Sequence, residues 1–382
     1  MKILFVTHYA GLYGANLSLL NLIKDLKKRY KAEPIVLLPR RGPLCKVLDK
    51  ENIEYIVSYH ADWRVNNNRE GIYGIEVALK WIIARSLNKP VLFPLALQQL
   101  NKENIDLIHS NSSVTYIGSY LSKKLNIPHI WHLREYGKPD YNLKFVYPLK
   151  YVKRIFNQSK SVIVISKSIY KYYSPIISKN ILKLIYNGID IRDYNKIFIS
   201  HQNIQFCIVG GISKEKNQLE ILKATKILKE RGLTNFKLHL IGNGSEKYIK
   251  ELKHFIKTNH LQQFVRWWDY QENVQPILKK MDVGIMSSKK EAFGRVTIEY
   301  MANYMPVIAT SEGANPELVI NNFNGFLYKV GNAKELSNNM EKLITNPKMI
   351  ETLGNNAFNW ANENFNMEKN TYEIYKLYRG AK

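Results

Sequence analysis

Cysteine is scarce in this chain. Only Cys45 and Cys207 occur among 382 residues, and they lie far apart. This excludes a disulfide-bonded secreted scaffold and a cysteine metal site, and it predicts a reducing, cytoplasmic location. Long apolar runs are also absent. No stretch approaches the roughly 18 consecutive apolar residues of a membrane-spanning helix, so no membrane span is predicted. The first apolar run, residues 3–6, is too short for a signal peptide and predicts a strand.

Several motifs of common enzyme classes are missing as well. The sequence has no Asp-x-Asp pair and no Cys/His cluster, so no metal site is predicted. It lacks GxxxxGK[ST], which excludes a P-loop kinase or ATPase. Apolar residues make up 45% and charged residues 23%, which excludes a disordered or fibrous chain. No cofactor is expected from these patterns.

Charge of one sign dominates the composition. Lys and Arg total 56 against 32 Asp and Glu, a formal net charge of +24. Residues 1–190 carry 29 basic and 13 acidic side chains, or +16, whereas residues 191–382 carry 27 and 19, or +8. A basic surface can bind nucleic acid, an anionic membrane or phosphorylated substrates. The alternative is a lysine-rich composition with no functional role.

Short apolar runs alternate with helical patterns along both halves of the chain. The predicted strands are 2–8, 33–39, 53–59, 105–111, 127–133 and 161–167, then 206–211, 236–242, 265–269, 283–288, 306–310 and 325–330. Apolar residues at helical spacing predict helices between them, including 16–30, 73–87, 115–125, 217–232 and 333–345. This alternation predicts an α/β protein with a doubly wound parallel sheet in each half.

The length also predicts two domains, because 382 residues exceed one ordinary core. The polar, turn-rich stretch 191–203 is the expected linker between residues 1–190 and residues 204–360. Parallel α/β sheets bind ligands beyond the carboxyl ends of their strands. Two such sheets facing each other would place a cleft between the domains.

Two strand–glycine–helix junctions are candidate anion sites. The first contains Gly14, Ala15 and Asn16, where a helix N-terminus would offer free N–H groups to an anion or a sugar hydroxyl. The second contains Gly211 and Lys216, where a cation beside helix N–H groups could hold a diphosphate. A plain tight turn and solvated lysines are the respective alternatives.

The stretch 288–310 is the most informative part of the sequence. Glu291 is expected in a loop after a strand, and Phe293-Gly294 is a turn into a helix that contains Glu299. The two carboxylates could bracket a ligand above the helix start, with a sugar at Glu291 and a ribose at Glu299. Arg295 would add positive charge for a phosphate. Two solvated surface acids are the alternative.

The order of these features resembles the retaining glycosyltransferases of family 4, which have the GT-B fold. The resemblance is carried by Glu291 to Glu299, the strand 306–310, Gly313 to Glu317, and Asn324-Gly325-Phe326. Residues 110–136 and the stretch Asn187-Gly188-Ile189-Asp190 agree more loosely. The resemblance implies that residues 1–190 bind the acceptor and residues 204–360 bind a nucleotide sugar. It also implies that the C-terminal helix in 361–382 packs back on the first domain.

The resemblance further implies a role for each matching residue. Glu291 is the first glutamate of the E-x7-E motif and contacts the donor sugar, whereas Glu299 holds the ribose. Lys216 neutralises the diphosphate, and His132 reaches the donor sugar from the first domain. The remaining donor-binding positions are Gly14, Ala15, Asn16, Gly211, Phe293, Gly294 and Arg295. Arg134 and Glu135, beside His132, are the expected acceptor-binding residues.

Two positions depart from the family pattern. Gly211 stands where the family often has arginine, and Arg295 or Lys214 is the hypothetical replacement for that charge. Tyr304 stands where the family usually has a helix-ending glycine, so a left-handed backbone there would be strained.

The prediction is therefore a metal-independent glycosyltransferase that retains the anomeric configuration. Its expected partners are a nucleotide sugar and a glycan or lipid-linked acceptor, with cell-surface polysaccharide synthesis as the process. It is expected in the cytoplasm, at most peripherally on the inner face of the plasma membrane, where an anionic surface could attract residues 1–190. The alternatives are a basic nucleic-acid-binding protein and a GT-B-fold epimerase or phosphorylase; nucleic acid is not an expected partner.

Overall fold

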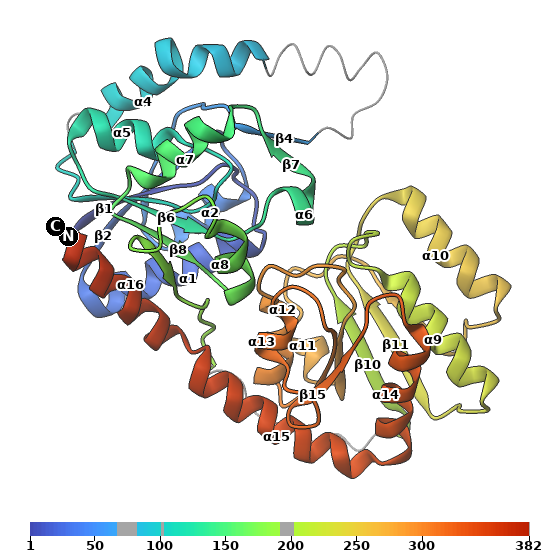
Figure 1. Ribbon diagram of the computed structural model, residues 1–382. Coiled ribbons are helices and arrows are strands. Elements are labelled where there is room, and N and C mark those ends of the chain that lie inside the picture. The colour runs from blue at the N-terminus through green and yellow to red at the C-terminus, as the bar shows by residue number, and fades with distance from the viewer. Residues whose placement is uncertain (67–81, 101–102, 192–201, 382) are drawn as a thin grey trace. The chain divides into compact units, whose positions relative to one another are not determined.

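The computed structural model describes residues 1–66, 82–100, 103–191 and 202–381 (Figure 1). The chain forms two compact units. Unit 1 comprises Met1–Gly188 and Met367–Lys382, and unit 2 comprises Ile189–Asn366. Most of the predicted linker 191–203 and most of the predicted helix 73–87 lie outside the described residues.

Unit 1 is built on a seven-stranded parallel sheet with the order β3-β2-β1-β5-β6-β8-β9. A separate antiparallel pair, β4 and β7, lies outside this sheet. The strands are β1 (Lys2–Val6), β2 (Glu33–Leu38), β3 (Glu54–Val57), β4 (Arg64–Asn66), β5 (Leu107–Ser110), β6 (His129–Leu133), β7 (Leu143–Phe145), β8 (Ser161–Val164) and β9 (Leu182–Leu184).

The helices of unit 1 connect these strands, as parallel pairing requires. They are α1 (Gly14–Tyr30), α2 (Pro43–Lys50), the π-helix η1 (Asn88–Leu92), α4 (Phe93–Leu100), α5 (Ile117–Leu125), α6 (Lys138–Tyr141), α7 (Leu149–Asn157), α8 (Lys167–Tyr173) and α16 (Met367–Ala381). Residues 82–87 are also helical and lead directly into η1.

Unit 2 repeats the architecture with a six-stranded parallel sheet of order β12-β11-β10-β13-β14-β15. Its strands are β10 (Ile204–Val209), β11 (Phe236–Ile241), β12 (Val265–Trp268), β13 (Val283–Met286), β14 (Val307–Thr310) and β15 (Gly325–Tyr328). Its helices are α9 (Gln218–Glu230), α10 (Glu246–Thr258), α11 (Gln275–Leu278), α12 (Arg295–Ala302), α13 (Asn315–Leu318), α14 (Ala333–Thr345) and α15 (Pro347–Asn364).

Each sheet has one point where the chain changes direction across the sheet. In unit 1 this point lies between β1 and β5, and in unit 2 between β10 and β13. Ligands of doubly wound sheets bind at such switch points, beyond the carboxyl ends of the strands. The fold class predicted from the sequence, two doubly wound parallel sheets, is confirmed.

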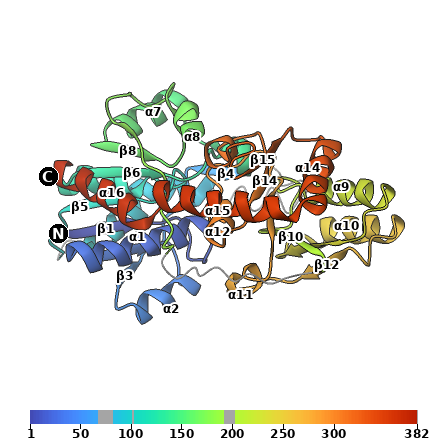
Figure 2. The ribbon, with the colours of Figure 1, turned by 90° about the horizontal axis from the view of Figure 1, so that it is seen from below.

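The C-terminal helix α16 belongs to unit 1, where Figure 2 shows it beside α1. Tyr375 stacks on Tyr30 of α1 with ring centroids 3.9 Å apart. The buried Tyr378 hydroxyl lies 2.6 Å from Nδ1 of His109 on β5. Residues 361–366, which the sequence grouped with this helix, fall in unit 2 instead, because α15 continues to Asn364.

Buried neutral histidines make the stability of unit 1 depend on pH. Burial lowers the pKa of His60 to about 4 and that of His129 to about 3. Both side chains are 2% exposed; His129 contacts the Ser110 hydroxyl at 2.8 Å. The unfolded chain binds these protons near the ordinary histidine pKa of about 6.5, whereas the folded chain does not. Stability is therefore complete above that pKa and is lost as pH falls toward 4.

We expect the free energy of unfolding to fall between pH 6.5 and pH 4 by up to about 1.4 kcal/mol per pH unit for each such histidine. Urea denaturation at a series of pH values measures this slope. His129→Gln should flatten it, whereas His254→Gln, at an exposed position of α10, should leave it unchanged. Equal slopes in all three proteins would contradict this assignment.

Candidate functional site

The loops after β10 and β13 meet at the switch point of unit 2. Lys216 follows β10, and its Nζ lies 2.7 Å from Oε2 of Glu291, which follows β13. The side chains are 36% and 15% exposed, so this ion pair is partly accessible to solvent. The Ser287 hydroxyl donates to the Lys216 carbonyl at 2.6 Å and holds the two loops together. A cation and a carboxylate, 75 positions apart in sequence, thus share one edge of the sheet.

The Glu291 loop is held by a third loop, which follows β14. The backbone N–H of Ala314 donates to the Glu291 carbonyl at 2.9 Å. Gly313, at φ +63°, makes this approach possible, because a Cβ there would lie 2.2 Å from the Glu291 carbonyl oxygen. The conformation and the contact both require glycine at this position. The position of Glu291 therefore depends on Gly313.

Helix α12 begins directly after this loop. Phe293 is 3% exposed, and Gly294 adopts φ +90° at the helix N-cap. Arg295 Nε donates to Glu299 Oε1 at 2.9 Å, one helical turn along. Their side chains are 21% and 13% exposed. A second cation–carboxylate pair therefore lies at the start of the helix that follows Glu291.

In unit 1, the loop after β1 is held by the side chain of Asn16. Its Oδ1 accepts from the Thr7 hydroxyl at 2.8 Å, and its Nδ2 donates to the carbonyls of Tyr9 and Gly11 at 3.0 and 2.9 Å. Asn16 is fully buried, so its amide shapes the loop. Gly14 is exposed at the first position of α1, and the Ala15 carbonyl accepts from Asn111 at 3.1 Å.

His132 lies within β6, one residue before the strand ends, inside the strand predicted at 127–133. It is fully buried, and burial lowers its pKa well below the ordinary value. Arg134 Nη2 lies 3.3 Å from His132 Nδ1. A neutral imidazole that accepts at Nδ1 carries its proton on Nε2. Nε2 has no hydrogen-bond partner in the structure, so a buried N–H donor is left open there.

Arg134 and Glu135 are buried beside His132 and are occupied by hydrogen bonds within unit 1. Arg134 donates to the side-chain oxygens of Asn111 and Asn187, each at 2.5 Å. Glu135 Oε1 accepts from the backbone N–H of Ser113 at 2.6 Å. The two charges are therefore compensated by polar groups from the loop after β5 and by Asn187, near the end of the first segment of unit 1.

Sequence reasoning did not select these partners. Asn111 and the serines after it lie in a polar run that directly follows a predicted strand, which was an available signal. Asn187 lies in the stretch 187–190 that agrees loosely with the family pattern, but nothing there pointed to Arg134 as its partner, and the pair His109–Tyr378 had no comparable signal. Their positions beside Arg134 and His132 depend on long-range contacts.

Comparison with known proteins decides the family. The model described as "Glycosyltransferase Family 4" matches residues 14–193, and the model "Glycosyl transferases group 1" matches residues 191–360. An uncharacterised glycosyltransferase of Methanocaldococcus jannaschii is 30% identical over 285 residues, which cover 73% of this chain and 76% of that protein. This chain belongs to glycosyltransferase family 4. It is thus a retaining glycosyltransferase that uses a nucleotide sugar.

A more distant relative and a solved structure are also similar to this chain over most of its length. The Escherichia coli UDP-Gal:alpha-D-GlcNAc-diphosphoundecaprenol alpha-1,3-galactosyltransferase is 24% identical over 305 residues, covering 73% of this chain and 76% of that enzyme. The crystal structure of Anabaena HepE in complex with UDP superimposes with a TM-score of 0.82 over the whole of both chains, at 23% identity. The predicted family and the GT-B fold are confirmed.

The structure also describes both departures from the family-4 pattern. A Cβ at Gly211 would meet no atom within 4 Å, so crowding does not explain the missing arginine. The two hypothetical replacements are both ion-paired, Arg295 with Glu299 and Lys214 with Glu251 at 3.9 Å.

Tyr304 keeps the left-handed backbone, with φ 59°. Its ring stacks on Phe358 of α15, with centroids 4.0 Å apart and an interplanar angle of 7°. Gly354 of α15 lets the backbone of Tyr304, in the turn after α12, approach the helix, because a Cβ at Gly354 would lie 2.1 Å from the Tyr304 carbonyl oxygen. The stacking contact offsets part of the strain of a left-handed tyrosine.

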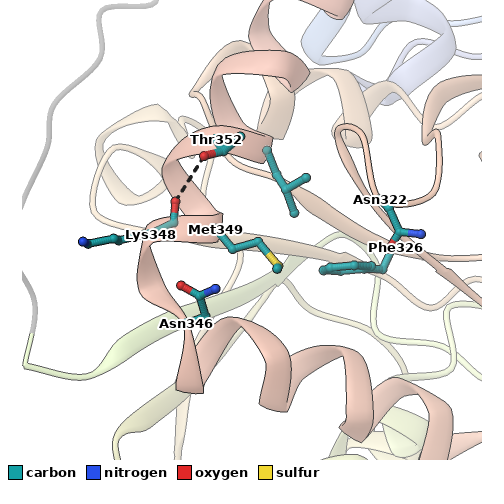
Figure 3. A pocket seen from close by; sticks show the side chains of 7 residues that line it. Asn322, Phe326, Asn346, Lys348, Met349 and Thr352 are labelled. Carbon is teal, nitrogen blue, oxygen red and sulfur yellow. Dashed lines mark hydrogen bonds between the residues drawn. The ribbon is translucent and has the colours of Figure 1, made fainter.

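The family-4 residues lie away from the open pocket of unit 2. A pocket of ≈ 430 Å³ lies near the start of β15, lined by Phe326, Asn346, Met349 and Leu353 among others (Figure 3). None of the predicted site residues lines it. Within the described ranges, no His, Cys, Asp and Glu side chains gather into a group of three that could hold a metal ion. The described residues also form no helix that could span a membrane.

Glycine substitutions test how the Glu291 loop is positioned. We expect Gly313→Ala to destabilise this family-4 enzyme by at least about 2 kcal/mol and to lower its turnover, because the Cβ overlaps the Glu291 backbone at a left-handed φ. Gly14→Ala is the control. Gly14 is the first residue of α1 and a Cβ there meets nothing within 4 Å, so the stability of this variant should be unchanged or slightly higher. Urea denaturation measures the stability of both variants, and donor turnover is measured for Gly313→Ala. Full activity in Gly313→Ala would show that the Glu291 loop tolerates displacement.

Proposed function

We propose that this enzyme transfers a sugar from a nucleoside diphosphate to a glycan or lipid-linked acceptor in cell-surface polysaccharide synthesis. The observation that carries the proposal is the pair of cation–carboxylate contacts at the switch point of unit 2, Lys216–Glu291 and Arg295–Glu299. The UDP named in the HepE structure and the diphosphoundecaprenol-linked acceptor named for the Escherichia coli enzyme support this donor and acceptor class.

In this proposal each unit-2 contact opens to receive one part of the donor. The diphosphate competes with Glu291 for Lys216, since both are anions at the same ammonium group. Glu291, released, accepts hydrogen bonds from the donor sugar. Glu299 accepts from the ribose hydroxyls, and Arg295 then adds positive charge near the diphosphate. The main-chain N–H groups at the start of α12, around Phe293 and Gly294, complete the anion site.

Retention of configuration requires the acceptor to attack the face from which the diphosphate leaves. The bond from the anomeric carbon to the phosphate oxygen breaks while a bond from the acceptor hydroxyl oxygen forms, and the hydroxyl proton passes to the departing phosphate oxygen. Lys216 stabilises the charge that develops on the leaving group, and Glu291 stabilises the positive charge that develops on the sugar. Lys216 and Arg295 supply the positive charge that a metal ion supplies in other nucleotide-sugar enzymes, so the reaction should not need a metal ion.

Unit 1 supplies the acceptor-binding residues in this proposal and one residue for the donor sugar. His132 offers its open Nε2–H as a hydrogen-bond donor to a hydroxyl of the donor sugar, and its lowered pKa keeps it neutral in that role. Arg134 holds the tautomer by donating to Nδ1. Arg134 and Glu135 contact the acceptor from the buried floor of this region, where their charges already order the loop after β5.

The test is a hydrolysis screen of UDP-, GDP- and ADP-sugars without acceptor, followed by calorimetry with each nucleotide diphosphate. We expect one nucleotide class to bind and its sugar to be hydrolysed slowly, with undiminished rates after chelation of divalent metals. A protein that binds none of the three nucleotides would overturn the donor assignment. Activity that disappears with chelation would overturn metal independence.

A further inference from the structure

A stripe of aliphatic side chains lies exposed along the helical stretch 82–100. Ile83, Leu87, Val91 and Leu95 are 58%, 41%, 42% and 48% exposed. In a regular α-helix, each step from residue i to residue i+4 turns the side chain by about 40° around the helix axis. The three steps from Ile83 to Leu95 would therefore carry the stripe onto another face. The π-helix η1 has wider i→i+5 turns, which reduce that drift and keep the four side chains aligned.

The opposite face of this stretch holds polar side chains against unit 1. Arg85 is 9% exposed, and its Nε donates to the Asp62 carbonyl at 2.7 Å. Asn88 is fully buried and makes two hydrogen bonds of 2.9 Å with the backbone of Ala61. The stretch is therefore anchored by these polar groups and by the buried apolar side chains of α4, while the four aliphatic side chains of the stripe face outward. Because exposed aliphatic side chains add nothing to the buried core, folding of the chain does not explain why four of them line up on the surface.

Helix α7 continues the same surface. Lys89 Nζ lies 5.0 Å from the Tyr151 ring centroid, which joins η1 to α7. Just before and at the start of α7, Val146 and Leu149 are 44% and 52% exposed. Figure 1 shows α4 and α7 on the same side of unit 1. Seven of the eight exposed large aliphatic side chains in the described part of the chain fall in 82–100 and 142–160.

Positive charge surrounds these aliphatic groups. The two segments contain no Asp or Glu at all. Their basic residues are Arg85, Lys89, Lys144, Lys150, Lys153, Arg154 and Lys160, and all but Arg85 are exposed. We name residues 82–100 and 142–160 together the α4–α7 surface.

We propose that the α4–α7 surface docks this enzyme on an anionic lipid bilayer. Aliphatic side chains can enter the headgroup region while the surrounding lysines remain at the lipid phosphates, and the combination of both signals gives stable attachment. Nucleic acid fits less well, because phosphates and sugars offer no partner for the aliphatic stripe. A second copy of the chain fits less well, because two such surfaces would place basic groups opposite basic groups.

This inference deepens the proposed lipid-linked acceptor, since docking would bring the enzyme to the membrane that carries it. Docking is tested independently of sugar transfer by co-sedimentation with two kinds of vesicle. One kind contains phosphatidylcholine alone and is neutral, and the other also contains about 30% phosphatidylglycerol and is anionic. We expect the wild-type chain to bind the anionic vesicles at least about tenfold more tightly than the neutral ones. We also expect binding to the anionic vesicles to weaken as the salt concentration is raised.

Two double variants separate the charge from the aliphatic stripe. Lys150→Glu with Lys153→Glu should lower binding to anionic vesicles by roughly thirtyfold, at about fivefold for each cation removed. Lys247→Glu with Lys250→Glu is the matched control, because it makes the same charge change at the same spacing on exposed positions of α10. Leu87→Glu with Val91→Glu should lower binding by on the order of tenfold or more, whereas Ile320→Glu, an exposed aliphatic of unit 2, should not.

The proposal is overturned by wild-type binding that is absent or equal on both kinds of vesicle, or by equal losses in the two lysine variants. It is also overturned if light scattering shows a wild-type dimer that Leu87→Glu with Val91→Glu dissociates, since a second copy would then cover the stripe. Tighter binding to RNA or DNA than to anionic vesicles, lost in the Lys150/Lys153 variant, would assign the surface to nucleic acid instead. Far-ultraviolet circular dichroism confirms that each variant is folded.

Discussion

Lys216→Ala should lower turnover by about a hundredfold, which corresponds to about 3 kcal/mol of lost stabilisation of the developing leaving-group charge. Lys216 is the cation that contacts Glu291 at the switch point of unit 2. Its contribution grows as the diphosphate leaves, so we expect a larger loss in kcat than in donor binding. The side chain is 36% exposed, and a partly exposed ion pair adds little to stability, so Tm should hardly change.

The control for this variant is Lys214→Ala. Lys214 lies two positions earlier in the same loop, is 67% exposed and forms an ion pair with Glu251 of α10 at 3.9 Å. Its loss should leave turnover within about twofold, the range of an exposed surface pair. Equal losses in Lys214→Ala and Lys216→Ala would mean that the loop's overall charge, and not the position of Lys216, supports the reaction.

Arg295 extends the same test to the missing family arginine. If Arg295 compensates for Gly211, Arg295→Ala should lower turnover, and adding Gly211→Arg in that background should restore part of it. The space around Gly211 permits this side chain, because a Cβ there meets no atom within 4 Å. An Arg295→Ala variant with normal turnover would end the compensation hypothesis.

Glu291→Gln and Glu299→Gln should change different kinetic parameters of the reaction. Glu291 is proposed to face the donor sugar, where its charge matters most as the ring becomes cationic. Its loss should lower kcat by about a hundredfold with a small change in donor affinity. Glu299 is proposed to hold the ribose, whose contacts are alike in ground and transition states. Its loss should raise the donor KM by about tenfold or more, the value of a charge-assisted hydrogen bond, with kcat nearly unchanged.

Steady-state kinetics with varied donor, together with calorimetry of nucleotide binding, separates these outcomes. His132→Ala should resemble Glu291→Gln, since both are proposed to act at the sugar, and His132→Gln should recover part of kcat by offering a donor N–H. Glutamine at 291 and at 299 is nearly isosteric with glutamate, so both proteins should fold. Normal nucleotide affinity in Glu299→Gln, or normal kcat in Glu291→Gln, would contradict the division of roles.

The regular elements were predictable because their signals are local. The strand expected at 33–39 is β2, Glu33–Leu38, and the helix expected at 217–232 is α9, Gln218–Glu230. Apolar periodicity within one segment suffices for these. β9, with three residues, and the antiparallel pair of β4 and β7 were not predicted. Three residues carry no measurable period, and their pairing is formed by segments far apart in the chain.

The sequence alone determined the family, the two-sheet fold and the acidic and basic residues worth testing, because each depends on residue type and spacing along the chain. Only the tertiary structure decided which of them meet. The adjacency of β10 and β13 brings Lys216 to Glu291, and Gly313 holds that loop in place. The structure likewise decided that His132 is buried with an open Nε2 and that Ile83, Leu87, Val91 and Leu95 face outward. Burial and long-range contacts arise from the packing of distant segments, and local spacing does not encode them.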